Sequence, residues 1–146
     1  MNIPSADTDA WNNAEGKRNG KVSIIRYRPE LEQYLGHSDY PKRLVIIWDY
    51  EELNASGVAS PDQIDEMGEF ENTIVNALDP DRAGILVLVV TNAGVREWHF
   101  YINDVSVVGE RINLALSGAR KFPISIQVEE GEHWEELRNV YKLCGE

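Results

Sequence analysis

The spacing of hydrophobic and polar residues is most informative between Gly84 and Asn103, where it predicts a β-hairpin. Residues 85–90 are all apolar, which is typical of a strand that is covered on both faces. Residues 91–94, Thr-Asn-Ala-Gly, favour a tight turn because asparagine and glycine tolerate positive φ. The following strand then carries Arg96, Trp98, Phe100 and Ile102 on one side and Glu97, His99 and Tyr101 on the other.

Other segments carry weaker strand patterns. Residues 9–15 and 21–28 predict a first hairpin with Asn19-Gly20 as its two-residue turn. Residues 43–50 are rich in β-branched and aromatic side chains, which favour a strand. Residues 123–129 alternate between apolar and polar, which predicts a last strand. The apolar positions of that strand, which we expect to be buried, are Ile124, Ile126 and Val128.

Apolar residues at helical spacing predict three helices and a helical turn at residues 30–36. Ser60 is a suitable N-cap, and Pro61 a suitable first residue, for a helix over residues 61–78. Asp104 caps a second helix, and residues 131–144 form the last one. The apolar positions are Ile64, Met67, Ile74, Val75 and Leu78 in the first helix, Val105, Val108, Ile112 and Leu116 in the second, and Trp134, Leu137, Tyr141 and Cys144 in the last.

The order of these elements predicts the fold class. From residue 43 onward it is strand, helix, strand, strand, helix, strand and helix. This order is typical of an α+β fold with a ferredoxin-like split βαβ unit, whose helices pack on one face of an antiparallel sheet. The N-terminal β-hairpin is expected to extend that sheet or cover part of its open face, and the last helix is an extra C-terminal element. We expect residues 1–8 to be frayed and residues 9–146 to form a single domain.

The charge of the chain narrows the choice of partners. The 146 residues carry a formal net charge of −11, so a phosphate backbone would be repelled and direct nucleic-acid binding is disfavoured. No apolar run approaches the ~20 residues that span a bilayer, and the N-terminus lacks the pattern of a secretory signal. Cys144 is the only cysteine, which excludes an internal disulfide. We therefore expect a cytoplasmic protein that binds neither nucleic acid nor membrane.

Glu71 is the most informative polar residue, because it falls within the apolar stripe of the helix at 61–78. A carboxylate buried there must be paired, hydrogen-bonded or protonated. Candidate partners are Arg26, Arg96 or a tyrosine hydroxyl. Two interpretations are open: a general acid or base at a site under the helix, or a buried polar contact that pins the helix to the sheet. We favour the second interpretation.

A second group of candidates, Arg96, Trp98, His99 and Tyr101, lies on the strand at 95–102. His99 and Tyr101 share a face, so they could bind a ligand or transfer a proton, although a histidine on a strand is more often a half-buried hydrogen-bonding residue. The opposite orientation of this strand, with Glu97, His99 and Tyr101 toward the helices, is also open, because both of its sides carry aromatic residues. The three histidines are too far apart in sequence for a metal site. We expect no metal and no cofactor, and no catalytic residue is assigned.

Several short segments, taken in order, resemble those of a known family. They are Trp11 with Ala14-Glu15-Gly16, Arg26 to Leu31, Arg43 to Ile46 ahead of Trp48 and Tyr50, Phe70-Glu71, Thr91 to Trp98 running into Phe100-Tyr101, and Phe122-Pro123-Ile124 before Trp134. This order resembles the bacterial family called domain of unknown function 695 (DUF695), over about residues 9–140. Members often have Asp-Pro before that last tryptophan, where this chain has Glu132-His133, a departure expected to alter only a helix entry. The resemblance implies no established activity and no catalytic residues.

Three hypotheses for function follow from these features. The preferred one is a non-enzymatic, acidic binding or regulatory module that presents a sheet face or helix edge to a protein partner. The second is an enzyme or small-ligand-binding protein with a pocket around Glu71, Arg96, His99 and Tyr101, which requires those side chains to converge at an open cleft. The third is an immunity-type inhibitor of a basic toxin. An exposed edge strand could also pair two copies as a homodimer.

Overall fold

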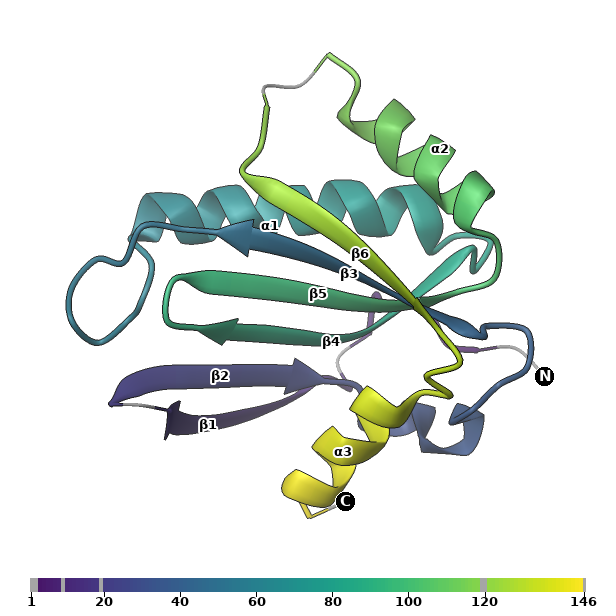
Figure 1. Ribbon diagram of the computed structural model, residues 1–146, viewed down its shortest axis with the longest axis horizontal. Helices are drawn as coiled ribbons and strands as arrows, with labels where there is room; N and C mark the ends of the chain where they lie inside the picture. The colour runs from purple at the N-terminus through teal and green to yellow at the C-terminus, as the bar shows by residue number, and fades with distance from the viewer. Residues whose placement is uncertain (1–2, 9, 19, 119–120, 146) are drawn as a thin grey trace.

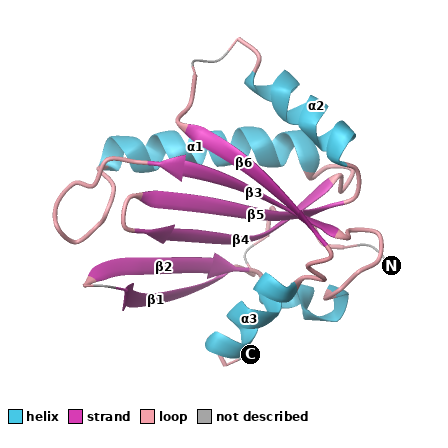
Figure 2. Cartoon of the chain, in the orientation of Figure 1, coloured by secondary structure: helices cyan, strands magenta, loops and turns pink. Residues whose placement is uncertain are grey.

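The computed structural model describes residues 3–8, 10–18, 20–118 and 121–145, and within them it is a mixed α+β fold built on a six-stranded, open antiparallel sheet (Figure 1). The strand order is β1-β2-β4-β5-β3-β6. The strands are β1 (Asn12–Arg18), β2 (Lys21–Tyr27), β3 (Lys42–Asp49), β4 (Gly84–Asn92), β5 (Val95–Ile102) and β6 (Ile124–Glu130) (Figure 2). The helices are η1, a 3₁₀ helix (Pro29–Tyr34), α1 (Pro61–Leu78), α2 (Val105–Leu116) and α3 (Glu135–Leu143). None of the helices in these residues is long and apolar enough to cross a membrane.

The helix α1 has the predicted boundaries, because its first turn is capped as the sequence indicates. The Ser60 hydroxyl accepts a hydrogen bond from the Gln63 N–H at 3.3 Å, and proline occupies the first helical position. The buried residues of α1 are Met67, Phe70, Ile74 and Leu78. Ile64, expected on the same stripe, is instead 46% exposed. The apolar stripe of α1 therefore begins one turn later than predicted, at Met67.

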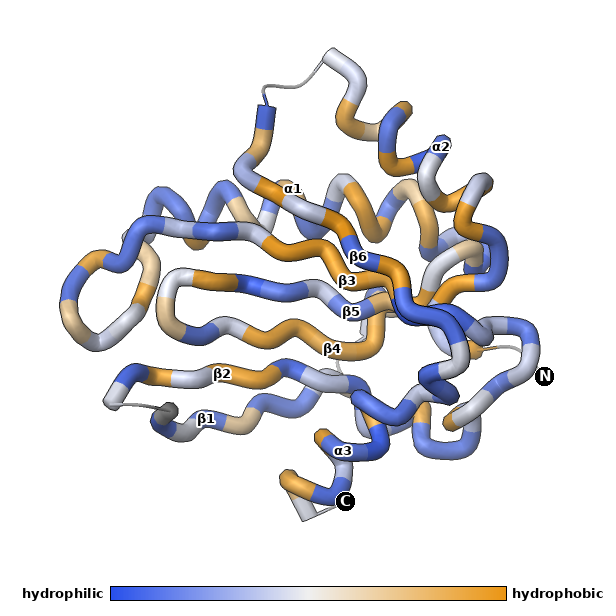
Figure 3. Tube along the Cα trace, viewed as in Figure 1, coloured by the Kyte–Doolittle hydropathy of each residue, from blue (hydrophilic) through white to orange (hydrophobic). Residues whose placement is uncertain are grey.

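Helical segments cover both faces of the sheet: α1 and α2 lie on the same face, as expected for the two helices between the strands, and η1 and α3 lie on the opposite face. The core on one face joins α1 and α2 to side chains such as Trp48, Trp98 and Phe100. The core on the other face joins η1 and α3 to the sheet, and there Tyr101 and Trp134 stack with ring centroids 4.3 Å apart. The reason lies in β4 and β5, which carry apolar or aromatic side chains on both faces and so require cover on both. Figure 3 shows the hydrophobic stretch along β4.

The β4–β5 hairpin is confirmed, and its two-residue turn consists of Ala93 and Gly94. Both residues have positive φ, 49° and 88°, as the twist of a two-residue hairpin turn requires. A β-bulge shifts the β4–β5 register between Leu86 and Leu88. Because of this bulge, Leu86 packs in the core under α1, whereas Val87 and Leu88 both pack in the core under α3.

The N-terminal hairpin extends the sheet, since β1 pairs with β2 and β2 pairs with β4. Its predicted turn includes Asn19, which lies outside the described residues. Residues 3–8 differ from the frayed terminus that we expected, because Ile3 and Ala6 are buried and the segment is hydrogen-bonded to the C-terminal end of α1. Residues 1 and 2 also lie outside the described residues.

The strand β6 forms an edge of the sheet, and its apolar side chains are less buried than predicted. Ile126 is 44% exposed and Val128 is 42% exposed, whereas Ile124 is half-buried against the core. Ile126 and Val128 stay exposed because α2 packs against α1 (Figure 1). On α2 itself Val108 is buried, but Val105, which was expected on the same stripe, is exposed.

Candidate functional site

Glu71 lies over a row of side chains that crosses three strands. Arg26 on β2 is the register partner of Val89 on β4, and Val89 is the register partner of Trp98 on β5. The Glu71 carboxylate accepts hydrogen bonds from Arg26 Nη1 at 3.1 Å, from Arg26 Nη2 at 3.3 Å and from Trp98 Nε1 at 2.9 Å. One carboxylate therefore connects α1 to both β2 and β5.

This geometry supports the interpretation of Glu71 as a polar contact that pins helix to sheet. Both carboxylate oxygens already accept charge-assisted or indole N–H hydrogen bonds. Arg96 lies beside this cluster, and its Nε donates to the Thr91 hydroxyl at 2.9 Å. Burial lowers the pKa of the Arg96 guanidinium, while the nearby negative charge of Glu71 acts in the opposite direction. Arg26, Glu71 and Trp98 therefore form one hydrogen-bonded network between α1 and the sheet.

A partly open cavity of about 610 Å³ adjoins the Glu71 cluster. Its walls come from the N-terminal segment, from Arg26 on β2 and from α1. The indole of Trp11 forms one wall, with its ring centroid 4.9 Å from Arg26 Cζ, and its Nε1 donates to the Ala6 carbonyl at 3.0 Å. The Arg26–Glu71 pair thus lies at the cavity surface, where the two side chains are 34% and 16% exposed.

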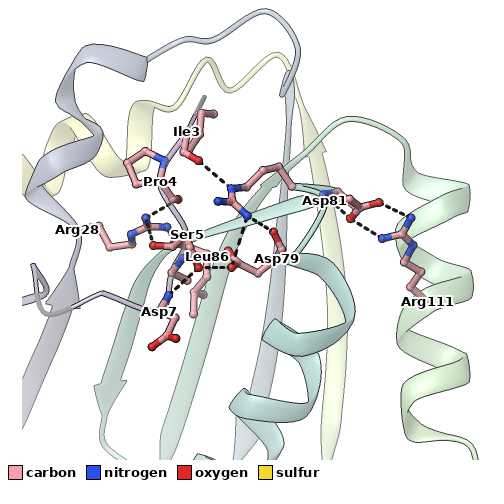
Figure 4. Close-up of polar contacts among 12 residues, drawn as sticks. Ile3, Pro4, Ser5, Asp7, Arg28, Asp79, Asp81, Leu86 and Arg111 are labelled. Atoms are coloured by element: carbon pink, nitrogen blue, oxygen red, sulfur yellow. Dashed lines mark hydrogen bonds and ion pairs between the residues drawn. The ribbon is translucent and has the colours of Figure 1, made fainter. Parts of the chain in front are cut away.

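Arg28 holds the N-terminal segment against the sheet (Figure 4). Its guanidinium is fully buried, and it donates to the carbonyls of Pro4 (2.8 Å), Ser5 (2.9 Å) and Leu86 (3.0 Å) and to the Glu30 carboxylate (2.9 Å). The backbone N–H of Arg28 donates to the Val87 carbonyl at 3.2 Å. Arg28 therefore satisfies carbonyls at the β4 bulge, where the ladder between β2 and β4 ends.

Asp79, the C-cap residue of α1, fixes the same segment from the side of the helix. Its carboxylate accepts hydrogen bonds from the Ser5 hydroxyl at 2.5 Å and from the Ala6 N–H at 3.0 Å. Arg82 donates to the Ile3 carbonyl at 2.8 Å and pairs with the Asp79 carboxylate at 3.8 Å. These contacts fix the N-terminal segment in place, and the segment forms one wall of the cavity.

His99 lies in a second cluster that does not include Glu71. It is buried, and both ring nitrogens have partners: Nδ1 lies 2.9 Å from Arg43 Nη1, and Nε2 lies 2.9 Å from Glu97 Oε1. Because a guanidinium can only donate, Nδ1 accepts and the ring proton is on Nε2, which donates to Glu97. Neither nitrogen is available to a substrate in this arrangement.

Tyr101, two residues along the same strand, is also engaged in a structural contact. Its hydroxyl donates to Glu132 Oε2 at 3.0 Å. Burial, together with the negative charge of Glu132, raises the pKa of this hydroxyl far above its ordinary value, so the group stays protonated. The same Glu132 carboxylate accepts the backbone N–H groups of Glu135 (3.0 Å) and Glu136 (2.7 Å). The departure at Glu132-His133 therefore lies at the entry of α3.

The structure brings together only part of the predicted site. Glu71, Arg26 and Trp98 meet directly, and Arg96 lies beside them. His99 and Tyr101 form a separate cluster with Arg43 and Glu132, and Tyr101 belongs to the core under α3. The pocket that was expected to gather Glu71, Arg96, His99 and Tyr101 therefore does not form, because the strand alternation of β5 sends the last two side chains to the opposite face.

Sequence reasoning did not single out Arg28 and Asp79, which hold the N-terminal wall of the cavity. Each stands next to a proline at the end of an element, and that position is the only local signal of either residue. Their partners are distant in sequence, since Asp79 and Ser5 are 74 positions apart. Trp11 was part of the family resemblance, but its place in the cavity wall depends on the same long-range contacts.

Across residues 3–8, 10–18, 20–118 and 121–145, no group of three histidine, cysteine, aspartate or glutamate side chains is placed to hold a metal ion. A model described as a family of unknown function, DUF695, matches residues 9–140. No curated protein and no solved structure matches the chain.

Proposed function

Since this chain belongs to the DUF695 family, whose description assigns no function, we propose that it is a non-enzymatic binding or regulatory module that acts on a protein partner. The candidate proton-transfer groups support this proposal, because Glu71, His99 and Tyr101 are each engaged in structural hydrogen bonds. An enzyme using these groups at one site would need them on the same face of the sheet. The net charge of −11 favours a basic partner, which it would attract at long range.

The edge strand β6 is the observation that carries the proposal. Within the described residues, β6 pairs with β3 through an uninterrupted register from Ile124 to Glu130, and no other strand covers its outer edge. Natural edge strands often carry charged side chains (lysine above all), a proline or a bulge that blocks further pairing. β6 has no lysine, proline or bulge, its two charges (Glu129 and Glu130) lie at its C-terminal end, and it exposes Ile126 and Val128. Such an edge is suited to accept another strand.

The side chains of β6 define the chemistry of the partner. Ile126 and Val128 offer apolar contacts on one face, and the strand ends in Glu129 and Glu130, which pair with Arg43 and Lys42 of this chain. Both carboxylates are on exposed residues and remain open to further cations. The partner is therefore an extended segment that adds to the sheet by β-augmentation, with apolar side chains at its centre and lysine or arginine near the two glutamates.

The experiment that tests this function is a pull-down from the native host with the wild-type chain and the Ile126→Lys variant. A lysine at this position removes the apolar contact and repels a basic segment, so we expect recovery of the partner to fall at least about tenfold, a loss of about 1.4 kcal/mol or more. Ile64→Lys is the matched control, because Ile64 is equally exposed but lies on α1.

The control variant should recover the same partner as the wild type. Absence of any recovered protein at low and moderate salt would contradict the proposal, and so would a partner that Ile126→Lys retains. A partner whose recovery does not weaken as salt rises would contradict the assigned basic character. Self-association of the wild type that Ile126→Lys abolishes would identify the occupant of the edge as a second copy of this chain.

An immunity-type inhibitor of a basic toxin would use the same surface and the same electrostatics. The genes next to the one that encodes this chain would distinguish this narrower role from a general regulatory role.

We place the protein in the bacterial cytoplasm, which its single cysteine supports. For the fold, we propose that β3, α1, β4, β5, α2 and β6 form a ferredoxin-like split βαβ unit, supported by the strand order β4-β5-β3-β6.

A further inference from the structure

The partly open cavity beside Glu71 has the size of a small-molecule site. Its volume of about 610 Å³ lies within the ~300–1,000 Å³ typical of ligand pockets. Its walls are held by the contacts of Arg28 and Asp79 to the N-terminal segment, so the space is defined before any ligand enters. This site is separate from the β6 edge and does not depend on the function proposed for it.

The charges in the lining are paired with one another, which limits the charge of a ligand. Arg26 is paired with Glu71, and Arg82 with Asp79. The remaining charged residue of the described lining is Asp7, which is exposed at the N-terminal wall. An anion such as a phosphate or a dicarboxylate would have to break an existing ion pair to find a counter-charge. The lining therefore favours a ligand without net negative charge.

The uncharged groups in the lining favour a ligand that both donates and accepts hydrogen bonds. Asn72 and Asn76 are exposed and lie four positions apart, so their amides occupy the same side of α1 and line the same cavity. Each amide offers a donor and an acceptor, as does the hydroxyl of Thr8. The indole of Trp11 and the apolar side chain of Val75 also line the cavity.

We propose that this cavity binds a neutral, hydroxyl-rich molecule of the size of a mono- or disaccharide. Neighbouring hydroxyl groups of such a molecule match the paired donor and acceptor of the Asn72 and Asn76 amides. Its C–H surface packs on the indole of Trp11, whose Nε1 is already bonded to the Ala6 carbonyl and whose ring centroid lies 4.9 Å from Arg26 Cζ. The Arg26–Glu71 pair forms the polar end of the cavity and positions the ligand through the N–H groups and lone pairs that remain.

Ligand-detected NMR and titration calorimetry test this proposal with defined probes: glucose, N-acetylglucosamine, maltose and myo-inositol, with inorganic phosphate and succinate as anionic comparisons. We expect at least one of the neutral probes to bind and both anions to bind more weakly. Asn76→Ala should weaken the bound neutral probe about tenfold, the effect of losing one or two hydrogen bonds. The side chain is exposed, so the variant should keep the wild-type unfolding temperature.

Asn113→Ala is the matched control, because Asn113 is an exposed asparagine on α2, outside the cavity lining. It should bind the probe as the wild type does. The proposal is overturned if none of the neutral probes binds at about 10 mM, a concentration that detects even millimolar affinity. Tighter binding of phosphate or succinate, or a neutral probe that Asn76→Ala binds unchanged, would also overturn it. None of these results bears on recovery of a protein partner by β6.

Discussion

Replacement of Arg28 by methionine is expected to lower the free energy of unfolding by about 3–5 kcal/mol, the range seen when one member of a buried ionic contact is removed. The fully buried guanidinium serves the Glu30 carboxylate and three carbonyls. Methionine fills a similar volume but donates no hydrogen bond, so these acceptors would be left unsatisfied. Urea unfolding, followed by tryptophan fluorescence, measures the change.

Arg111→Met is the control for this prediction. Arg111 also makes a short ion pair, with Asp81 at 2.6 Å, but the two side chains are 37% and 55% exposed. Exposed pairs contribute little, because water and salt screen them. We therefore expect Arg111→Met to unfold at nearly the wild-type urea concentration. Equal effects of the two substitutions would show that Arg28 is not buried at the β4 bulge.

Replacement of Trp134 by alanine is the second change with a large expected effect, about 3–5 kcal/mol of destabilisation. Trp134 is buried, its ring stacks on Tyr101 at 4.3 Å and its Nε1 donates to the Tyr40 carbonyl at 3.0 Å. Alanine would leave a large cavity under α3. We expect both the free energy of unfolding and the protection of α3 amides from hydrogen exchange to fall.

Trp134→Phe separates packing from hydrogen bonding in this contact. Phenylalanine keeps an aromatic ring against Tyr101 but leaves the Tyr40 carbonyl without its donor. The expected loss is smaller, about 1–2 kcal/mol. A loss below about 1 kcal/mol for Trp134→Ala, measured in the same way, would mean that α3 does not pack on the sheet as described.

Local sequence patterns predicted the elements whose signals are local. The helix at 61–78 carries its own cap at Ser60, and the hairpin at 84–102 carries its own turn and an unbroken apolar strand. Glu71 could be singled out because a carboxylate inside an apolar stripe requires a partner, and Arg26 was among the candidates. For the helix and the hairpin, the residues that determine the structure lie within a few positions of the element that they form, whereas Arg26 lies 45 positions from Glu71.

Other features could not be predicted because their causes are distant in sequence. The alternation in β6 indicates an apolar face, but it does not show whether a helix covers that face, so Ile126 was expected to be buried. Residues 3–8 have no periodic pattern, and what holds them is Arg28 and Asp79. The separation of His99 from Glu71 follows from the β5 alternation, but the Arg43 that engages His99 comes from the neighbouring strand.

The central claim is that the Glu71 carboxylate joins α1 to the sheet through Arg26, which fixes both the helix and a wall of the cavity. A double-mutant cycle with Arg26→Met, Glu71→Gln and the combined variant tests this claim most directly, with the free energy of unfolding as the readout. We predict a coupling energy of about 1–2 kcal/mol, as expected for a half-buried pair in direct contact. Additive effects, within about 0.3–0.5 kcal/mol, would contradict the claim.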